Sequence, residues 1–109
     1  MADILGAFEQ AVLLTTLHLE KNAYGRAILR GLDDALGREV AAGALYATLD
    51  RLEAKKYVRS FLGEATPDRG GRPRRYFHVT AAGIRALNDS KAATEAIWQG
   101  VSWPIRGSA

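Results

Sequence analysis

The sequence predicts a mainly helical α+β fold in one domain, with a β-hairpin between the third and the last of four helices. Three observations support this prediction. Apolar residues recur at helical spacing in four segments, and two β-prone runs flank a turn-rich connector. At 109 residues the chain is too short for two domains. Because so small a domain buries a modest core, we expect it to complete that core by self-association.

The first two helices are predicted from apolar periodicity and from capping residues. Residues 4–19 carry an apolar stripe so wide that the helix should be buried on more than one side. The second helix should begin after Asn22, a favourable N-cap, and end before Gly37, which suits the left-handed position after a helix. Residues 38–40 make a short link that could contribute a brief strand.

The third helix is expected over residues 41–55, with Leu45, Leu49 and Leu52 facing inward. Its start, 41-AAGA-44, has only small side chains, although Gly43 costs a helix about 1 kcal/mol relative to alanine. Such small side chains allow another molecule or element to approach the helix backbone closely. Either this helix start packs tightly on another helix, or it approaches a partner molecule.

Two strands are predicted next, over residues 57–64 and 74–79. In the first strand, Val58 and Leu62 share one face. The connector between the strands, ATPDRGGRP, is rich in turn residues. The strands should therefore pair as a hairpin with a long tip.

The last helix should begin after Thr80, which suits an N-cap, and end before Pro104. The reciprocal Glu or Gln of a capping box is missing, because Gly83 occupies that position. A three-four spacing connects Ile84, Leu87, Lys91, Thr94, Trp98 and Val101. This seam is long enough to pair with a partner helix. Its apolar members are the candidate dimerisation residues: Ile84, Leu87, Trp98 and Val101.

Positive charge is concentrated around the hairpin. The chain carries 15 Lys and Arg residues but a net charge of only +3. The cations between positions 55 and 75 are Lys55, Lys56, Arg59, Arg69, Arg72, Arg74 and Arg75. A local basic patch on a nearly neutral body points to a polyanionic partner.

Three helices, a hairpin with a basic tip and a final helix form a winged helix-turn-helix pattern. In such a fold the third helix enters the major groove of DNA with its N-terminal residues at the base edges. The hairpin, or wing, lies beside it, where arginines can follow phosphates or enter the negatively charged minor groove. Gly70 and Gly71 permit close approach of the backbone, and Pro73 limits the entropy lost on docking. We therefore predict a DNA-binding domain over residues 1–80 and a dimerisation helix over residues 81–104.

The candidate contacts to duplex DNA come from the second helix, the third helix and the wing. They are Tyr24, Gly43, Tyr46, Thr48, Arg51, Arg69, Gly70, Gly71, Arg72, Arg74 and Arg75. Thr48 and Arg51 are expected on the same outward side of the third helix, although Arg51 could pair with a neighbouring carboxylate. Tyr24 and Tyr46 could instead be packing tyrosines. The wing arginines could form a solvated surface loop.

Four ordered motifs resemble those of the PadR-like transcriptional regulators: 5-LGAFEQAVLL-14, 23-AYG-25, 43-GALYATLDRLEAKKYV-58 and 69-RGGRPRRYFHVTAAG-83. The likeness covers roughly residues 4–87. It implies a homodimeric winged-helix repressor of duplex DNA, with the C-terminal helix as the dimerisation element. This family usually offers a polar residue near the start of its recognition helix. The small residues found here favour phosphate contacts and DNA shape over base readout.

The single helix after Thr80 is similar to the short subfamily of these regulators. Short members resemble multidrug sensors that stack flat aromatic compounds between dimer-related tryptophans. By this resemblance Trp98, on the seam, is the candidate wall of a site for a small aromatic effector, with Leu5 and Phe8 beside it. Trp98 and Trp103 could instead be ordinary core or interface residues.

Other function classes find little support in the sequence. Without cysteine there is no disulfide, thiolate metal site or cysteine nucleophile, and the two histidines lie 60 positions apart. No nucleophile has a nearby base, so we expect no enzyme activity, no metal and no cofactor. The N-terminus lacks a basic signal region, and no apolar stretch reaches membrane length. We expect a cytoplasmic protein.

The remaining alternative is a winged-helix module that binds protein, or nucleic acid without an operator. Single-strand binding usually requires exposed stacking aromatics on a basic groove. Only Tyr57, Phe61 and Tyr76 are near the basic segment, which favours a duplex. An inverted repeat in the adjacent promoter, protected by the protein, would separate a regulator from such a module.

Overall fold

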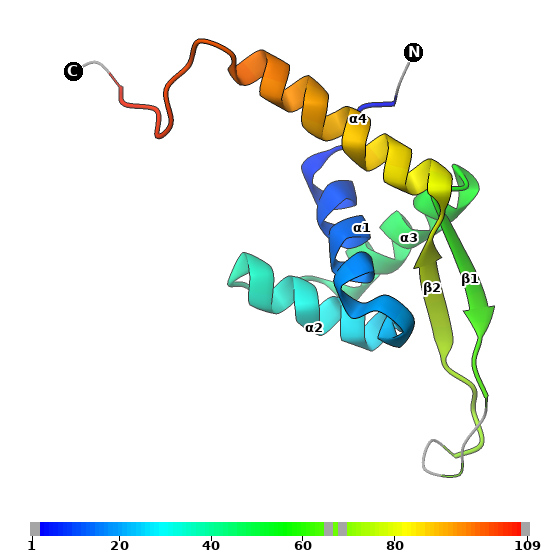
Figure 1. Ribbon diagram of the computed structural model, residues 1–109. Helices are drawn as coiled ribbons and strands as arrows, with labels where there is room; N and C mark the ends of the chain where they lie inside the picture. Colours follow the sequence, from blue (N-terminus) through cyan, green and yellow to red (C-terminus); the bar gives the residue numbers. More distant parts are fainter. Residues whose placement is uncertain (1–2, 65–66, 68–69, 108–109) are drawn as a thin grey trace.

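The computed structural model describes residues 3–64, 67 and 70–107. Its elements in chain order are the helix α1 (Ala7–Leu19), the 3₁₀ turn η1 (Glu20–Asn22), the helices α2 (Gly25–Leu36) and α3 (Ala42–Ala54), the strands β1 (Val58–Leu62) and β2 (Arg75–Val79), and the helix α4 (Ala81–Trp98). The predicted mainly helical α+β class is confirmed. The hairpin extends away from the body, and α4 runs across the opposite end (Figure 1).

The core lies where α1 meets α2, α3 and the hairpin. The leucines predicted to face inward from α3 are all buried, which confirms that prediction: Leu45, Leu49 and Leu52. In α1, Val12 and Leu13 are buried, whereas Leu14 and Leu17 are exposed. The wide apolar stripe of α1 is therefore only partly covered within one chain.

The first helix begins later than predicted, at Ala7 rather than at residue 4. Gly6 is its N-cap, and the Gly6 N–H donates to Glu9 Oε1 at 3.2 Å. A side chain that returns from the first turn to the N-cap backbone marks a helix start, so residues 3–6 remain outside the helix.

The segment before α2 departs from the prediction because it joins the hairpin. Glu20–Asn22 form the 3₁₀ turn, and the N-cap of α2 is Tyr24 rather than Asn22. The Phe77 N–H donates to the Ala23 carbonyl at 2.8 Å, and Tyr24 forms a β-bridge to the same strand. Backbone groups that pair with a strand are unavailable to a helical turn, which delays the helix.

The link after α2 also differs from the prediction. Gly37 closes the helix in the left-handed conformation, with φ 65°, as predicted. The brief strand predicted at residues 38–40 is wrong, since the structure describes all three residues and none is in a strand. The Val40 N–H instead donates to Asp33 Oδ1 at 2.7 Å. A side chain of α2 therefore satisfies a backbone donor that a strand would have paired.

The two strands pair antiparallel as the predicted hairpin, with Val58 opposite Val79 and Leu62 opposite Arg75. Val58 and Phe77 are buried in the core. Leu62 shares the face of Val58, as the period of a strand requires, but it is 68% exposed because it lies beyond the core, toward the tip.

The last helix begins as predicted and ends earlier. Thr80 Oγ1 accepts a hydrogen bond of 3.1 Å from a backbone N–H in the first turn, so Thr80 is the N-cap. α4 ends at Trp98, and Gly100 takes a left-handed conformation with φ 83°. The prediction that Pro104 ends the helix is wrong, because the chain turns before reaching it. Val101 therefore lies beyond the helical part of the seam.

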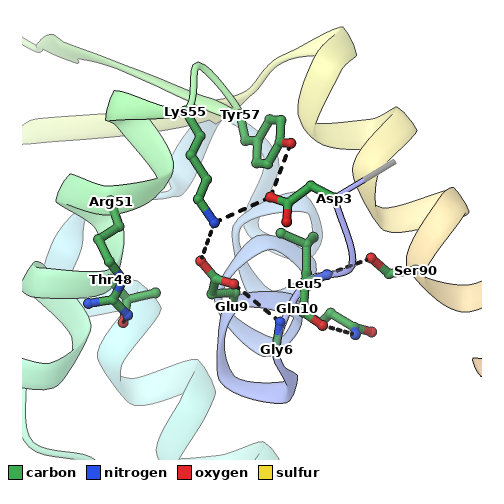
Figure 2. Close-up of polar contacts among 10 residues, drawn as sticks. All are labelled: Asp3, Leu5, Gly6, Glu9, Gln10, Thr48, Arg51, Lys55, Tyr57 and Ser90. Atoms are coloured by element: carbon green, nitrogen blue, oxygen red, sulfur yellow. Dashed lines mark hydrogen bonds and ion pairs between the residues drawn. The ribbon is translucent and has the colours of Figure 1, made fainter. Parts of the chain in front are cut away.

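An N-terminal clasp, formed by Asp3, Leu5 and Glu9, ties the start of α1 to Lys55 and Tyr57, in the turn between α3 and β1 (Figure 2). Lys55 Nζ lies 3.3 Å from both Asp3 Oδ2 and Glu9 Oε2. The Tyr57 hydroxyl donates to Asp3 Oδ2 at 3.2 Å. The clasp thus fixes the short turn that joins α3 to the hairpin.

The N-terminal clasp also reaches α4. The Leu5 N–H donates to Ser90 Oγ at 2.9 Å, and Gln10 Nε2 donates to the Leu5 carbonyl at 2.9 Å (Figure 2). Ser90 is fully buried, so this bond is shielded from water. The clasp therefore connects the C-terminal helix with the root of the hairpin.

Candidate nucleic-acid interface

The first turns of α3 present a bare outer surface. Ala42, Gly43 and Ala47 are exposed, and a Cβ added at Gly43 would meet no other atom within 4 Å. Among the described residues, none packs against Gly43, which excludes tight helix packing as the reason for 41-AAGA-44. The other interpretation, an open helix start that approaches a partner, fits a recognition helix.

A cleft of about 340 Å³, which we call the α2 cleft, lies between the start of α2 and the first residues of β2. It is lined by Tyr24, Gly25, Arg26, Tyr46, Arg74, Arg75 and Phe77. Three guanidinium groups and a helix N-terminus therefore surround one opening. Because helix N–H groups and arginine side chains both bind phosphate oxygens, the cleft suits a phosphate of the DNA backbone.

Tyr46 reaches the α2 cleft from α3 because residue 25 is glycine. A Cβ added at Gly25 would come within 2.9 Å of the Tyr46 ring, which is closer than side chains approach each other. Tyr46 is 47% exposed, so it packs with one side and faces solvent with the other. The sequence reasoning missed Gly25 and Arg26 as cleft residues. The glycine that opens a helix directly after Tyr24 was the available signal.

Arg74 and Tyr24 form the wall of the α2 cleft on the hairpin side. The Arg74 guanidinium lies 4.1 Å from the centre of the Tyr24 ring. Tyr24 meets the Tyr76 ring edge-on at 5.8 Å, and Tyr76 stacks on Phe61 at 5.8 Å. A cation–π contact holds a guanidinium without occupying its N–H donors, which can therefore bind an anion.

Arg75 is held differently from Arg74, by side chains of α3 and β1. Its Nη2 donates to Glu53 Oε1 at 3.0 Å and to Ser60 Oγ at 2.9 Å. Ser60 Oγ in turn donates to Glu53 Oε2 at 2.6 Å. A carboxylate therefore already neutralises this guanidinium in the absence of DNA.

The wing tip has an open backbone. Gly70 and Gly71 both lie in the left-handed region, with φ 65° and 77°, and a Cβ at either would meet no atom within 4 Å from the other residues that the structure describes, chain neighbours aside. Arg72 follows and is exposed. Arg69, a candidate DNA contact, lies outside the residues that the structure describes. Glycine is suited to these two positions because L side chains are strained there.

A model of the PadR-like family of transcriptional regulators matches residues 13–89, more than half of the chain. The chain belongs to the PadR-like family. It is similar to the structure of a PadR-like transcription factor from Bacteroides fragilis, with 29% identity, a TM-score of 0.72 and 84% of each chain covered. A PadR-family regulator from Eggerthella lenta is 29% identical, with a TM-score of 0.64 over 84% of this chain and 80% of that one.

A third structure shows the same fold at lower identity. This is a PadR-like regulator from Bacillus cereus, 23% identical, with a TM-score of 0.70 over 86% of each chain. None of the curated proteins matches the sequence significantly. The PadR-like protein described here is thus a winged-helix transcriptional regulator that binds DNA, and it is not an enzyme. Over residues 3–64, 67 and 70–107, no helix is long and apolar enough to cross a membrane.

One predicted DNA contact of the PadR-like regulator lies on the inner side of α3. Thr48 is 1% exposed and shares the buried stripe of Leu45 and Leu49, so the prediction that it faces outward is wrong. Arg51 is exposed, and its Nη2 donates to Thr48 Oγ1 at 3.0 Å. Thr48 can therefore orient Arg51 but cannot itself reach a ligand.

The three candidate effector residues occupy different environments. Leu5 is 3% exposed and belongs to the core, so within one chain it offers no surface to a ligand. Phe8 is half-buried and packs against the core. Trp98 is half-buried at the end of α4, where its ring meets that of Trp103 edge-on at 5.8 Å.

A groove of about 430 Å³ lies between α1 and α4 of the PadR-like chain. Its lining residues are Gln10, Leu14, Leu17, Ile84, Leu87, Asn88 and Lys91. Ile84 is 43% exposed, whereas Leu87 is 8% exposed and belongs to the chain's own core. The seam predicted on α4 therefore presents Ile84 outward and leaves Leu87 largely internal. The α1 leucines were missed, although an apolar stripe too wide for one core face was visible in the sequence.

Proposed function

We propose that this PadR-like regulator is a homodimeric repressor that recognises a palindromic site on duplex DNA. The observation that carries the proposal is the α2 cleft, in which Tyr46, Arg74 and the start of α2 converge beside the open start of α3. A phosphate held in this cleft would fix the register of the duplex, so that α3 enters the adjacent major groove. Tyr24 supports Arg74, and Thr48 supports Arg51 as a further backbone contact.

The wing tip would hold the duplex on the other side of α3. Gly70 and Gly71 bring the backbone near the sugar-phosphate chain, while Arg69 and Arg72 supply charge to phosphates or to a narrow minor groove. Because the outer face of α3 starts with small residues, Gly43 would let the helix approach the base pairs closely. Phosphate contacts and DNA shape would then contribute more to selectivity than hydrogen bonds to bases.

A two-fold dimer would present two such surfaces to the halves of a palindrome. The α1–α4 groove and the exposed part of the α4 seam support this assembly, with Ile84, Trp98 and Val101 at the interface and Leu87 behind them. Recognition helices of a dimer are spaced by one turn of DNA, about 34–36 Å.

An aromatic effector would relieve repression by binding between the two α4 helices of the dimer. The regulator would act in the cytoplasm, where it meets both the effector and the DNA. Trp98 supplies a ring face for a planar cation. Phe8 is the other candidate wall of the effector site, and the buried Leu5 would support this wall from the core. Occupancy would change the spacing of the recognition helices and so couple effector binding to operator binding.

The proposal is tested on the promoter of the gene that encodes the protein. Footprinting should show two protected segments related by an inverted repeat, and transcription in vitro from that promoter should fall. Planar cationic dyes that quench tryptophan fluorescence should reverse the protection. Uniform weak binding to every duplex, without a protected repeat, would contradict an operator-specific repressor and leave a general DNA-binding module.

A further inference from the structure

Three elements meet in one closed network of side chains, which we call the Glu53 triad. Glu53 comes from the last turns of α3, Ser60 from the middle of β1, and Arg75 from the first position of β2. The three hydrogen bonds measure 3.0, 2.9 and 2.6 Å, and each member bonds to both others. The hydroxyl both donates and accepts, the carboxylate uses both oxygens, and the two bonds from Arg75 both start at Nη2.

The Glu53 triad lies where it can set the angle between the wing and α3. The short turn after Ala54 attaches the hairpin to α3 at the Val58 end of β1. Arg75 pairs with Leu62 at the other end of the ladder, nearest the wing tip. A bond from Arg75 back to α3 therefore acts far from the point where the hairpin is attached, where it restrains the angle of the hairpin most strongly.

A role of Arg75 in direct phosphate binding is less consistent with these contacts. A phosphate contact that draws the guanidinium away from Glu53 would break the ion pair and leave the Glu53 carboxylate beside the phosphate backbone. Like charges at that distance repel, and the cost would offset the new contact. Arg74 has no such conflict, since an aromatic face holds it.

We propose that Arg75 is a positioning residue for DNA binding, which Glu53 and Ser60 hold so that the wing and α3 engage one duplex together. This inference rests on the proposed DNA-binding function and removes Arg75 from the direct contacts. Arg74 and Arg72 remain contacts. The triad contributes through geometry, because exposed ion pairs add only about 1 kcal/mol or less to stability.

The test compares the salt dependence of binding to a fluorescent random-sequence duplex. Arg72→Gln, the matched control with the same loss of charge, should reduce the slope of log K against log salt by about 0.9. Arg75→Gln should lower affinity about fivefold with the slope unchanged. Glu53→Gln, which removes a negative charge near the interface, should also lower affinity. Ser60→Ala changes no charge, and it should also lower affinity with the slope unchanged.

The decisive variant exchanges the two charges. Glu53→Arg combined with Arg75→Glu keeps the net charge and can rebuild the ion pair, so it should recover most of the affinity that either single change loses. A phosphate contact at Arg75 predicts the reverse: no recovery, tighter binding by Glu53→Gln, and a reduced slope for Arg75→Gln. Any of these three results would overturn the inference.

The wing angle can be measured directly because the chain has no cysteine. Spin labels on Ala47→Cys and Leu62→Cys, both exposed positions, report the distance between α3 and the wing. The distribution should broaden in Glu53→Gln and narrow again in the charge exchange. An unchanged distribution contradicts the positioning role. If the wild type and Arg72→Gln both fail to bind any duplex, the proposed function fails and the inference falls with it.

Discussion

At the scale of single residues, two glycines determine what α2 and α3 can approach. The Tyr46 side chain occupies the space that a side chain at position 25 would need, whereas Gly43 faces open space. The same chemical change at these two positions should therefore have opposite effects on stability. One glycine is required by packing inside the chain, and the other is available to a partner outside it.

Gly25→Ala should destabilise the protein by about 1–3 kcal/mol, because the new methyl group overpacks against Tyr46. DNA affinity should fall as well, since the ring must leave the α2 cleft. Urea denaturation and duplex titration measure the two effects. Gly43→Ala is the control: it should raise stability by up to about 1 kcal/mol through helix propensity, while affinity falls if α3 lies close to DNA. A Gly25→Ala protein of wild-type stability would refute the packing argument.

At the scale of elements, the N-terminal clasp links α1, the turn between α3 and β1, and α4 through charges and hydrogen bonds. Hydrogen bonds with Asp3 and Glu9 raise the pKa of Lys55. Burial and the nearby Asp3 charge raise the pKa of Tyr57. Both shifts favour the protonated forms in the folded state, so folding stability should decline when these groups lose their protons.

The stabilisation by Lys55 should be fully present below its ordinary pKa of about 10.5 and should vanish as the pH rises through its higher folded-state pKa. Lys55→Gln should therefore lower stability by up to about 1 kcal/mol at neutral pH, and this gap should begin to close above pH of about 10.5. Lys56→Gln removes the same charge outside the clasp and serves as the control. Denaturant midpoints measured from pH 7 to 11 test this. A gap that persists at the highest pH would argue against the ion pairs.

At the scale of the whole molecule, uncovered apolar surface on α1 and α4 is the main support for the proposed dimer. Leu14, Leu17 and Ile84 are exposed around the same groove. The clasp connects this region to the root of the hairpin through Leu5 and Ser90. Displacement of α4 within a dimer could therefore reach the wing through bonded contacts.

Ile84→Asp and Leu17→Asp should each weaken the dimer by at least about tenfold, because each places a charge where apolar side chains should meet. Leu62→Asp is the control, since Leu62 is an apolar residue that is even more exposed but lies on the hairpin. Analytical ultracentrifugation at several concentrations measures the change. A wild-type protein that stays monomeric at high concentration would contradict the dimer. Leu87→Asp is less informative, because Leu87 is largely buried and its loss would unfold the chain.

Local chemistry in the sequence was sufficient to predict the elements and their order. Helical and strand periods, Gly37 as a C-cap, Thr80 as an N-cap and the turn-rich connector all act over a few residues, so they can be read without knowing the fold. The basic wing and the bare start of α3 were likewise visible. These features are enough to indicate a winged helix and a polyanionic partner.

Only the tertiary structure decided which partners the side chains choose. Thr48 turned inward because the α3 stripe meets α1, and Tyr24 became an N-cap because β2 pairs with the segment before it. Arg75 pairs with Glu53 across 22 positions, and Leu5 bonds to Ser90 across 85. Such contacts depend on how elements that are far apart in the sequence pack together, and local periodicity and capping residues carry no information about that packing. The basic hairpin and the bare helix start were therefore predictable, whereas the side-chain network that holds Arg75 was not.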